Sequence, residues 1–504
     1  MAGPTVSSRT APVVLVSVPH GGNAGNVLRT GLVTRLLASD PSVQVVLVSP
    51  LVRDSGFVRE FAHPRVRFED LPPHRPTGLE ARLMALVQAS YVDSGVTEAV
   101  RIRRQEAIAQ KSLRWIRAKR LLAGVLAPSI VRKESRYALL DRLISHPQAE
   151  QLFDLYRPVL LVASSPGLIF AEIPLLRTAA RRGVRSMAVD ASWDNFTNKI
   201  LPVRRVDRLI VWNELMKQQA IELHGYRPDE VQLTGPPHWD LYFHEDPSAT
   251  REAFFQRIGA DLSRKLVTLT TTPRELYPHY DHVIRVLIRG MAERRFPHPC
   301  QLLVRVHPRD EIERYTEFVN VPHVMIEKPF RATVRTGDGM AIDITTESQR
   351  HLADTLRHSD VIVQVASTIA VEASIFDTSV VNVSFDGETP SEWTRSARRY
   401  LRFTHFANVT RHGAVKLAET PEQLIEGVAE YLRDPAIDAA GRRRVVEEQC
   451  HFLDGRSSER VANFVVEALL EVSGLAPRST RAPTNTEPAH PPARASIGKT
   501  AADL

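Results

Sequence analysis

Residues 359–387 read SDVIVQVASTIAVEASIFDTSVVNVSFDG and predict a strand, a helix and a second strand. Val361–Val365 is an unbroken apolar run rich in β-branched residues, which is typical of a parallel strand buried on both faces. Ile369–Phe376 then predicts a short helix, and Val380–Phe385 the next strand. The small-residue turn before the helix would point free backbone N–H groups and the positive helix end at one place. Such a turn suits a phosphate group.

Polar side chains of the same stretch extend this hypothesis. Ser367 and Thr368 lie where the helix begins, and Glu372, one turn further, is placed to reach a ribose hydroxyl. The alternative interpretation is an ordinary βαβ unit in which the hydroxyl groups only cap a helix. Our working hypothesis is that this turn holds the diphosphate of an activated donor.

Length and composition allow two domains and a tail. The chain has 504 residues, of which 43% are hydrophobic and 24% are charged, as is usual for soluble globular proteins. Its two cysteines, Cys300 and Cys450, form neither a disulfide framework nor a zinc pattern, so we expect a reducing, cytoplasmic location. No run is typical of a membrane-spanning helix or a signal peptide. The net charge of +7 suits an anionic partner without identifying it.

Strand-like apolar runs alternate with helical segments in both halves of the chain. The runs are 13–18, 43–48, 159–163, 185–189, 208–212 and 231–234, and then 265–270, 300–306, 324–326, 341–344, 361–365 and 380–385. This alternation predicts two Rossmann-like, doubly wound α/β domains that face a cleft. We expect an N-terminal acceptor domain at 1–246 and a C-terminal nucleotide-donor domain at 247–475. Residues 476–504 are rich in Pro, Thr, Ala and Ser and predict a disordered tail.

Residues 78–147 predict a helical insertion in the first domain. Between Arg101 and Arg136 the only acidic residues are Glu106 and Glu134, against eleven Lys and Arg. One interpretation is a basic helix that contacts an anionic membrane surface or an anionic acceptor. The other is a solvated helix whose apolar stripe packs in the core. Nucleic acid is not expected as a partner, because no recognition motif accompanies the charge.

Two turns of the first domain carry candidate side chains. The first strand runs into His20-Gly21-Gly22, where the glycines permit a tight turn and His20 follows a strand end. Asp190–Pro202, which reads DASWDNFTNKILP, lies between two predicted strands. Ligands bind outside the carboxyl ends of strands in such sheets, so both turns are placed to meet a substrate.

Four turns of the second domain follow predicted strands and carry groups suited to phosphate or sugar. They are Thr271–Arg274, His307–Arg309, Ala366–Thr368 with Glu372, and Asp386-Gly387. The strands of a parallel sheet end on the same side, so these turns should meet at one edge. Arg274 and Arg309 would neutralise a diphosphate leaving group without a metal. We see no paired-aspartate metal motif beside these turns and expect no required metal or other cofactor.

The motifs, taken in order, resemble the two-domain GT-B glycosyltransferase superfamily. The most similar branch includes the CDP-glycerol glycerophosphotransferases of teichoic-acid synthesis and the UDP-N-acetylglucosamine 2-epimerases. The matching motifs are GPPHWD at 235–240, LLVRVHPR at 302–309, SDVIVQVASTIAVEAS at 359–374 and DGRSSERVANFV at 454–465. The resemblance implies donor binding by Gly235, Arg274, His307, Arg309, Ser367, Thr368, Glu372 and Asp386.

The chain departs from this branch at one position. The glycerophosphotransferases resemble one another in a Trp-His-Gly-x-x-x-Lys turn that supplies a catalytic histidine. Here Trp193 and Lys199 keep that spacing, but Asp194 stands at the histidine position. A carboxylate can also accept a hydroxyl proton. This difference favours sugar transfer over glycerophosphate transfer.

The resulting hypothesis is a metal-independent glycosyltransferase of cell-surface polysaccharide or glycolipid synthesis. It would move a sugar from a nucleotide-activated donor to a glycan or lipid-linked acceptor, at the inner face of the membrane. Asp194 is the preferred general base, with His20 and Asp190 in reserve, and the acceptor would meet Gly21, Gly22, Trp193 and Lys199. The alternatives are a CDP-alcohol phosphotransferase of the teichoic-acid type and a non-catalytic GT-B-like binding protein.

Overall fold

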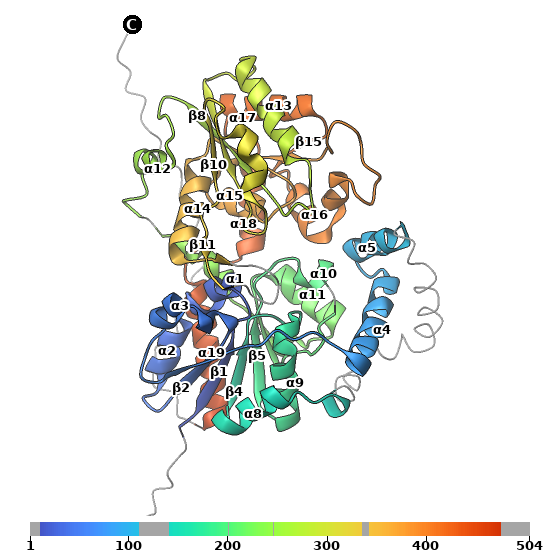
Figure 1. The fold of residues 1–504 in the computed structure, drawn as a ribbon, viewed down its shortest axis with the longest axis vertical. Helices are drawn as coiled ribbons and strands as arrows, with labels where there is room; N and C mark the ends of the chain where they lie inside the picture. The colour runs from blue at the N-terminus through green and yellow to red at the C-terminus, as the bar shows by residue number, and fades with distance from the viewer. Residues whose placement is uncertain (1–10, 110–140, 200, 245, 335–341, 475–504) are drawn as a thin grey trace, which may run out of the picture.

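The protein is described here by a computed structural model that covers residues 11–109, 141–199, 201–244, 246–334 and 342–474. Figure 1 shows two lobes, one above the other, and each is built on a parallel sheet. The predicted pair of Rossmann-like α/β domains is therefore confirmed. The predicted tail at 476–504 and most of the basic segment 101–136 lie outside the described residues.

The first lobe holds a seven-stranded parallel sheet in the order β3-β2-β1-β4-β5-β6-β7. Its strands are β1 (Val13–Ser17), β2 (Gln44–Val48), β3 (Val66–Glu69), β4 (Leu160–Ala163), β5 (Arg185–Val189), β6 (Arg208–Val211) and β7 (Val231–Leu233). Every residue of β1 is buried, because helices cover both faces of the sheet. The strand order reverses between β1 and β4, which is where sheets of this kind bind ligands.

Nine α-helices of this part of the chain lie between these strands in sequence, within the described residues. They are α1 (Gly21–Asn23), α2 (Leu32–Ser39), α3 (Ser55–Glu60), α4 (Gly78–Ser94), α5 (Glu98–Ala109), α8 (Pro147–Tyr156), α9 (Ile173–Arg182), α10 (Asn195–Asn198) and α11 (Glu214–His224). None of the helices in the part of the chain that the structure describes has the length and apolar composition needed to cross a bilayer.

The second lobe holds a six-stranded parallel sheet in the order β10-β9-β8-β13-β14-β15. Its strands are β8 (Lys265–Thr270), β9 (Cys300–Arg305), β10 (Val324–Glu327), β13 (Val361–Gln364), β14 (Ser379–Val383) and β15 (Lys416–Ala418). Its helices are α12 (Arg251–Ile258), α13 (Tyr280–Ala292), α14 (Thr346–His358), α15 (Ile369–Ile375), α16 (Thr404–Thr410), α17 (Pro421–Arg433) and α18 (Ala439–Cys450). A short antiparallel pair, β11 (Arg331–Ala332) and β12 (Ile342–Asp343), lies outside this sheet.

The last described helix, α19 (Ser457–Ser473), returns to the first lobe, as its red ribbon shows in Figure 1. Its apolar face, with Val461, Val465 and Leu469, is buried in the same cluster as residues of β1 and α2. Each fully buried aliphatic side chain of this kind contributes about 1.5–3 kcal/mol of apolar burial. The predicted domain boundary at 246 assigned this helix to the second domain, but its apolar side chains pack on the first lobe.

The helical insertion connects the two lobes. Ala99 and Ile102 of α5 belong to the apolar core of the second lobe. Near the end of α5, Glu106 accepts a hydrogen bond from the guanidinium of Arg399 at 3.0 Å. In the described part of the basic segment, residues 101–109, the apolar side chain of Ile102 therefore packs into the protein core, as the second interpretation predicted.

Candidate active site

The four donor turns of the second lobe share one sheet edge, as predicted. They follow β8, β9, β13 and β14, which are parallel neighbours. The backbone N–H of His307 donates to the Thr271 hydroxyl at 2.9 Å, and the Tyr277 hydroxyl donates to the carbonyl of Phe385 at 3.0 Å. These bonds tie the β8 turn to the turns after β9 and β14. Three of the four turns are thus directly linked to one another.

The turn at 366–368 differs from the expectation of free backbone N–H groups. Ala366 N–H donates to Asn382 Oδ1 at 2.7 Å, Ser367 N–H to Gln364 Oε1 at 3.2 Å, and Ile369 N–H to the Ser367 hydroxyl at 3.3 Å. Buried side chains of β13 and β14 satisfy the first two amides, and the Ser367 hydroxyl of the turn satisfies the third. Leaving these amides unpaired would cost free energy. A phosphate would have to rely on other groups or displace these bonds.

His307, in the turn after β9, is held as a neutral imidazole. Burial, together with the positive charge of Arg309, lowers the pKa of His307 to about 4. The backbone N–H of Arg309 donates to His307 Nδ1 at 3.0 Å, which leaves the ring proton on Nε2. The side chains of Arg309 and Arg274 are exposed. His307 can therefore donate to a phosphate oxygen, with two arginines at the same edge.

Two of the predicted donor carboxylates are engaged inside the protein. Glu372 is 7% exposed, and its Oε2 accepts a hydrogen bond from the Tyr242 hydroxyl at 2.7 Å. Asp386 accepts backbone N–H groups of Ser391 at 3.0 Å and Ala397 at 2.8 Å, which shapes the loop after β14. A ribose contact by Glu372 stays a prediction, and in this structure Tyr242 already takes one of its oxygens.

Gly235 directly follows Thr234 after β7, the last strand of the first sheet, and contacts the start of α19. Its φ is +81°, a conformation that favours glycine, and a Cβ there would collide with the Ser457 hydroxyl. The carboxylate of Asp240 accepts the backbone N–H groups of Ser457 at 2.8 Å and Ser458 at 2.7 Å, at the start of α19. The motifs GPPHWD and DGRSSER thus hold each other, which gives both a structural role.

The turn after β5, which was predicted to meet the acceptor, carries Asp194 in an ionised form. Its carboxylate lies 3.5 Å from the Lys199 ammonium and accepts a hydrogen bond from the Asn198 amide at 3.2 Å. Burial would raise the pKa of Asp194, but interactions with Lys199 and His405 and hydrogen bonds from Ser192 and Asn198 outweigh it and lower that pKa. A carboxylate with a depressed pKa is a weak proton acceptor.

His405 is a candidate that the sequence patterns did not indicate. It belongs to α16 of the second lobe, and its ring packs edge-on against Trp193, with centroids 5.1 Å apart. Burial lowers the pKa of His405, which favours the neutral imidazole, although Asp194 opposes this shift. Its Nδ1 is buried without a hydrogen-bond partner among the described residues. The His405 imidazole therefore packs against Trp193, next to Asp194 in the sequence, from the opposite lobe.

His20, Gly21 and Gly22 also face the second lobe. The side chain of His20 caps α1 by accepting the backbone N–H of Asn23 at 3.4 Å. A Cβ at Gly22 would lie 3.7 Å from the side chain of Ile344, which follows β12. That distance is an ordinary van der Waals contact, and the tighter neighbour of such a Cβ, at 3.3 Å, is the ring of His20 itself. An acceptor role for this turn stays a prediction.

Asp190 directly follows β5 and has a buried carboxyl group. Burial raises the pKa of Asp190 to about 7, in spite of hydrogen bonds from Asn195 and Ser192. Its Oδ2 has no hydrogen-bond partner within the described chain. The Trp212 indole N–H donates to the Asp190 carbonyl at 2.8 Å and fixes the backbone here.

Replacing Asp190 by asparagine should remove a pH-dependent loss of stability. The pKa rises from 3.8 to about 7 on folding, so the stability contribution is complete below 3.8 and is lost as the pH rises through 7. Between pH ~5 and pH ~8 the wild type should lose about 2–3 kcal/mol of unfolding free energy that Asp190→Asn does not lose. Urea unfolding of both proteins at the two pH values measures this. If the unfolding free energies of the two proteins change equally with pH, the pKa of Asp190 is not raised in the folded state.

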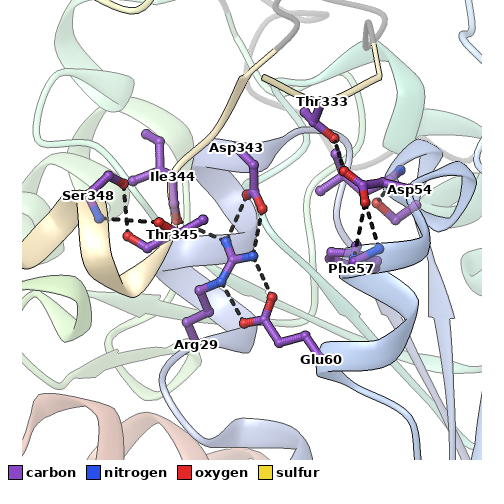
Figure 2. Close-up of polar contacts among 12 residues, drawn as sticks. Arg29, Asp54, Phe57, Glu60, Thr333, Asp343, Ile344, Thr345 and Ser348 are labelled. Atoms are coloured by element: carbon purple, nitrogen blue, oxygen red, sulfur yellow. Dashed lines mark hydrogen bonds and ion pairs between the residues drawn. The ribbon is translucent and has the colours of Figure 1, made fainter. Parts of the chain in front are cut away.

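An ion-pair latch, formed by Arg29, Glu60 and Asp343, joins the lobes beside the HGG turn (Figure 2). Arg29 makes a two-pronged pair with Asp343 of β12, at 2.8 and 2.7 Å, and donates to Glu60 at 2.8 Å. Burial disfavours its charge, but hydrogen bonds to Glu60 and Asp343 raise the pKa of Arg29. Nearby, the Thr333 hydroxyl donates to Asp54 at 2.7 Å.

Two facing Rossmann-like lobes with a C-terminal helix that returns to the first define a protein of the GT-B class. Solved structures share this fold across most of their length. Staphylococcus aureus MnaA with UDP has 13% identity and a TM-score of 0.53, with coverage of 93% of this chain and 99% of its own. UDP-GlcNAc 2-epimerase of Neisseria meningitidis bound to UDP-GlcNAc has 12% identity and a TM-score of 0.52, with coverage of 90% and 100%.

Sequence comparison goes further than fold. The family model of CDP-glycerol:poly(glycerophosphate) glycerophosphotransferase matches residues 177–467, more than half of the 504 residues. The chain belongs to this family, and the predicted relationship is confirmed. No curated protein sequence matches the chain.

Proposed function

We propose that this protein transfers a polyol phosphate from a nucleotide-activated alcohol of the CDP-glycerol type to a hydroxyl acceptor. Membership of a transferase family supports the reaction class. The contact between His405 and Trp193 is the observation that supports transfer of a polyol phosphate in particular. The turn that supplies a histidine in similar transferases has Asp194 here, and His405 returns an imidazole to the same place from the opposite lobe.

The donor side would use His307 and the two exposed arginines. The Nε2–H of His307 donates to an oxygen of the donor diphosphate, and Arg274 and Arg309 neutralise its charge. The Thr271 hydroxyl holds His307 in place by accepting a 2.9 Å hydrogen bond from the His307 backbone N–H. These groups lie at the carboxyl edge of the sheet, where nucleotides bind in folds of this type.

The acceptor side would use His405 as the general base. His405 takes the proton of the acceptor hydroxyl as that oxygen forms a bond to the β-phosphorus of the donor. The bond from this phosphorus to the bridging oxygen breaks, and CMP leaves. Asp194, ionised beside Lys199, stabilises the imidazolium that forms. Gly21, Gly22 and Trp193 would border a glycan or lipid-linked acceptor.

Sugar transfer is the second candidate. Asp194 at the usual histidine position favours it, and two structures of similar fold are described with UDP and with UDP-GlcNAc. In that reaction the acceptor oxygen attacks the anomeric carbon, and a nucleoside diphosphate leaves. The nucleotide product therefore separates the two candidates.

The test is to identify the released nucleotide. The purified full chain is incubated with a glycerol-phosphate acceptor and either CDP-glycerol or UDP-GlcNAc, and nucleotides are resolved by chromatography. Release of CMP from CDP-glycerol is expected, and release of UDP from UDP-GlcNAc alone would indicate sugar transfer. Thermal unfolding gives a parallel reading, because a donor at about 100 times its Kd adds about 2.7 kcal/mol of stability. No stabilisation by any nucleotide would contradict both candidates and favour a non-catalytic protein.

A further inference from the structure

Three side chains meet at the base of the helical insertion, away from the donor edge. His74 lies in the loop after β3, Glu80 in the first turn of α4, and His146 directly before α8. His74 and Glu80 therefore mark the start of the insertion and His146 its end. The three residues join chain segments that are separated by about 70 residues of sequence.

One potential ligand atom from each residue lies within 4.8 Å of the other two. The Nε2 of His74 is 3.2 Å from Oε2 of Glu80, and the rings of His74 and His146 meet edge to face with centroids 5.0 Å apart. The Nε2 of His146 is buried and lacks a hydrogen-bond partner among the described residues, whereas the Nε2 of His74 is paired with Glu80. His146 is only 9% exposed, and a buried nitrogen of this kind normally has a partner, so its unpartnered Nε2 is free to bind a ligand at this cluster.

Glu80 divides its two oxygens between different partners. Oε1 pairs with the buried guanidinium of Arg177, whereas Oε2 faces the imidazoles. Arg177 also lies 3.9 Å from Asp141, so two carboxylates share its charge. An outer partner of this kind orients a ligating carboxylate and keeps it ionised.

Space for a further ligand adjoins the cluster. A cavity of about 750 Å³ is lined by His74 and His146, together with apolar residues that include Pro73 and Leu152. Two imidazoles and one carboxylate, with an open position for water, form a ligand set that suits Zn²⁺. Mg²⁺ and Ca²⁺ prefer oxygen ligands and suit it less.

We propose that His74, Glu80 and His146 bind a zinc ion that fastens the two ends of the helical insertion to the first lobe. Closing a long loop in this way lowers the entropy of the unfolded chain and fixes where α4 and α8 begin. The insertion contacts the second lobe through α5, so the ion would set the position of that contact too. The site is separate from the donor turns, at which no metal is expected.

The test measures bound metal in the full-length chain, purified without a metal-binding tag. The protein is stripped with a chelator, re-equilibrated with one equivalent of ZnCl₂ and freed of unbound metal. Elemental analysis should then give about one zinc per chain, and zinc should raise Tm by several degrees. His74→Asn and His146→Asn should each hold less than about a tenth of that zinc and show no zinc-dependent rise in Tm.

His63→Asn is the matched control, because His63 is an exposed histidine of the loop just before β3. It should keep the full zinc content and the shift in Tm. Circular dichroism checks that each variant is folded, and Co²⁺ bound to the wild type gives a second reading through its visible spectrum. A wild type that retains no zinc, or site variants that retain as much as His63→Asn, would overturn the proposal.

Discussion

His405→Gln should lower kcat for group transfer by about 10²–10⁴ while the donor still stabilises the protein against heat. Glutamine fills much of the space beside Trp193 and keeps a polar group there, but it cannot accept the acceptor proton. The loss should therefore appear in turnover and leave donor binding intact. Steady-state kinetics and thermal unfolding with CDP-glycerol measure the two effects separately.

Two further variants make this prediction specific. His412→Gln alters a histidine just after α16 that pairs with Glu448 at 3.2 Å, and it should keep normal kcat. Asp194→Asn removes the attraction that raises the pKa of His405, so the acidic limb of the pH–rate profile should move to lower pH. Near-normal kcat in His405→Gln would exclude it as the base and return that role to Asp194 or Asp190.

Arg29→Ala should destabilise the protein by about 3–5 kcal/mol, because it leaves a buried carboxylate without its partner. The side chain of Asp343 is fully buried and that of Arg29 is 3% exposed, so water cannot replace the lost bonds. The latch joins the lobes, so its loss should also separate them. Urea unfolding measures the free energy, and small-angle X-ray scattering measures the radius of gyration.

The matched control is Arg285→Ala. Arg285 pairs with Glu317 at 2.9 Å, but both side chains are about half exposed, and such surface pairs contribute only about 0–1 kcal/mol. If Arg29→Ala lowers the unfolding free energy no more than Arg285→Ala and leaves the radius of gyration unchanged, the latch does not hold the lobes together.

The sheets were predictable because buried parallel strands are continuous apolar runs. Lys265–Thr270 and Arg185–Val189 are strands with the bounds that their runs indicated. Two edge strands escaped notice. Val66–Glu69 alternates apolar and charged residues, and Lys416–Ala418 has only three residues, so neither stands out from its surroundings.

The site was predicted only in part, because topology fixes which turns meet but not which groups are free. Parallel pairing placed His307, Arg309 and Ser367 at one edge. The partners of the turn amides, Asn382 and Gln364, are strand residues whose roles depend on packing. His405 left no motif because its neighbours, Trp193 and Asp194, lie about 210 residues earlier in the sequence.

Because α19 returns to the first lobe, the two lobes cannot be expressed separately simply by cutting the chain between them. A product that stops at the polar link near 246 lacks α19, and it exposes the apolar surface that Val461, Val465 and Leu469 cover. Such a truncated product would be prone to aggregation. Two separately expressed halves would still complement each other, since the second brings the missing helix. Cloning boundaries should therefore follow the shared cores and not the order of residues.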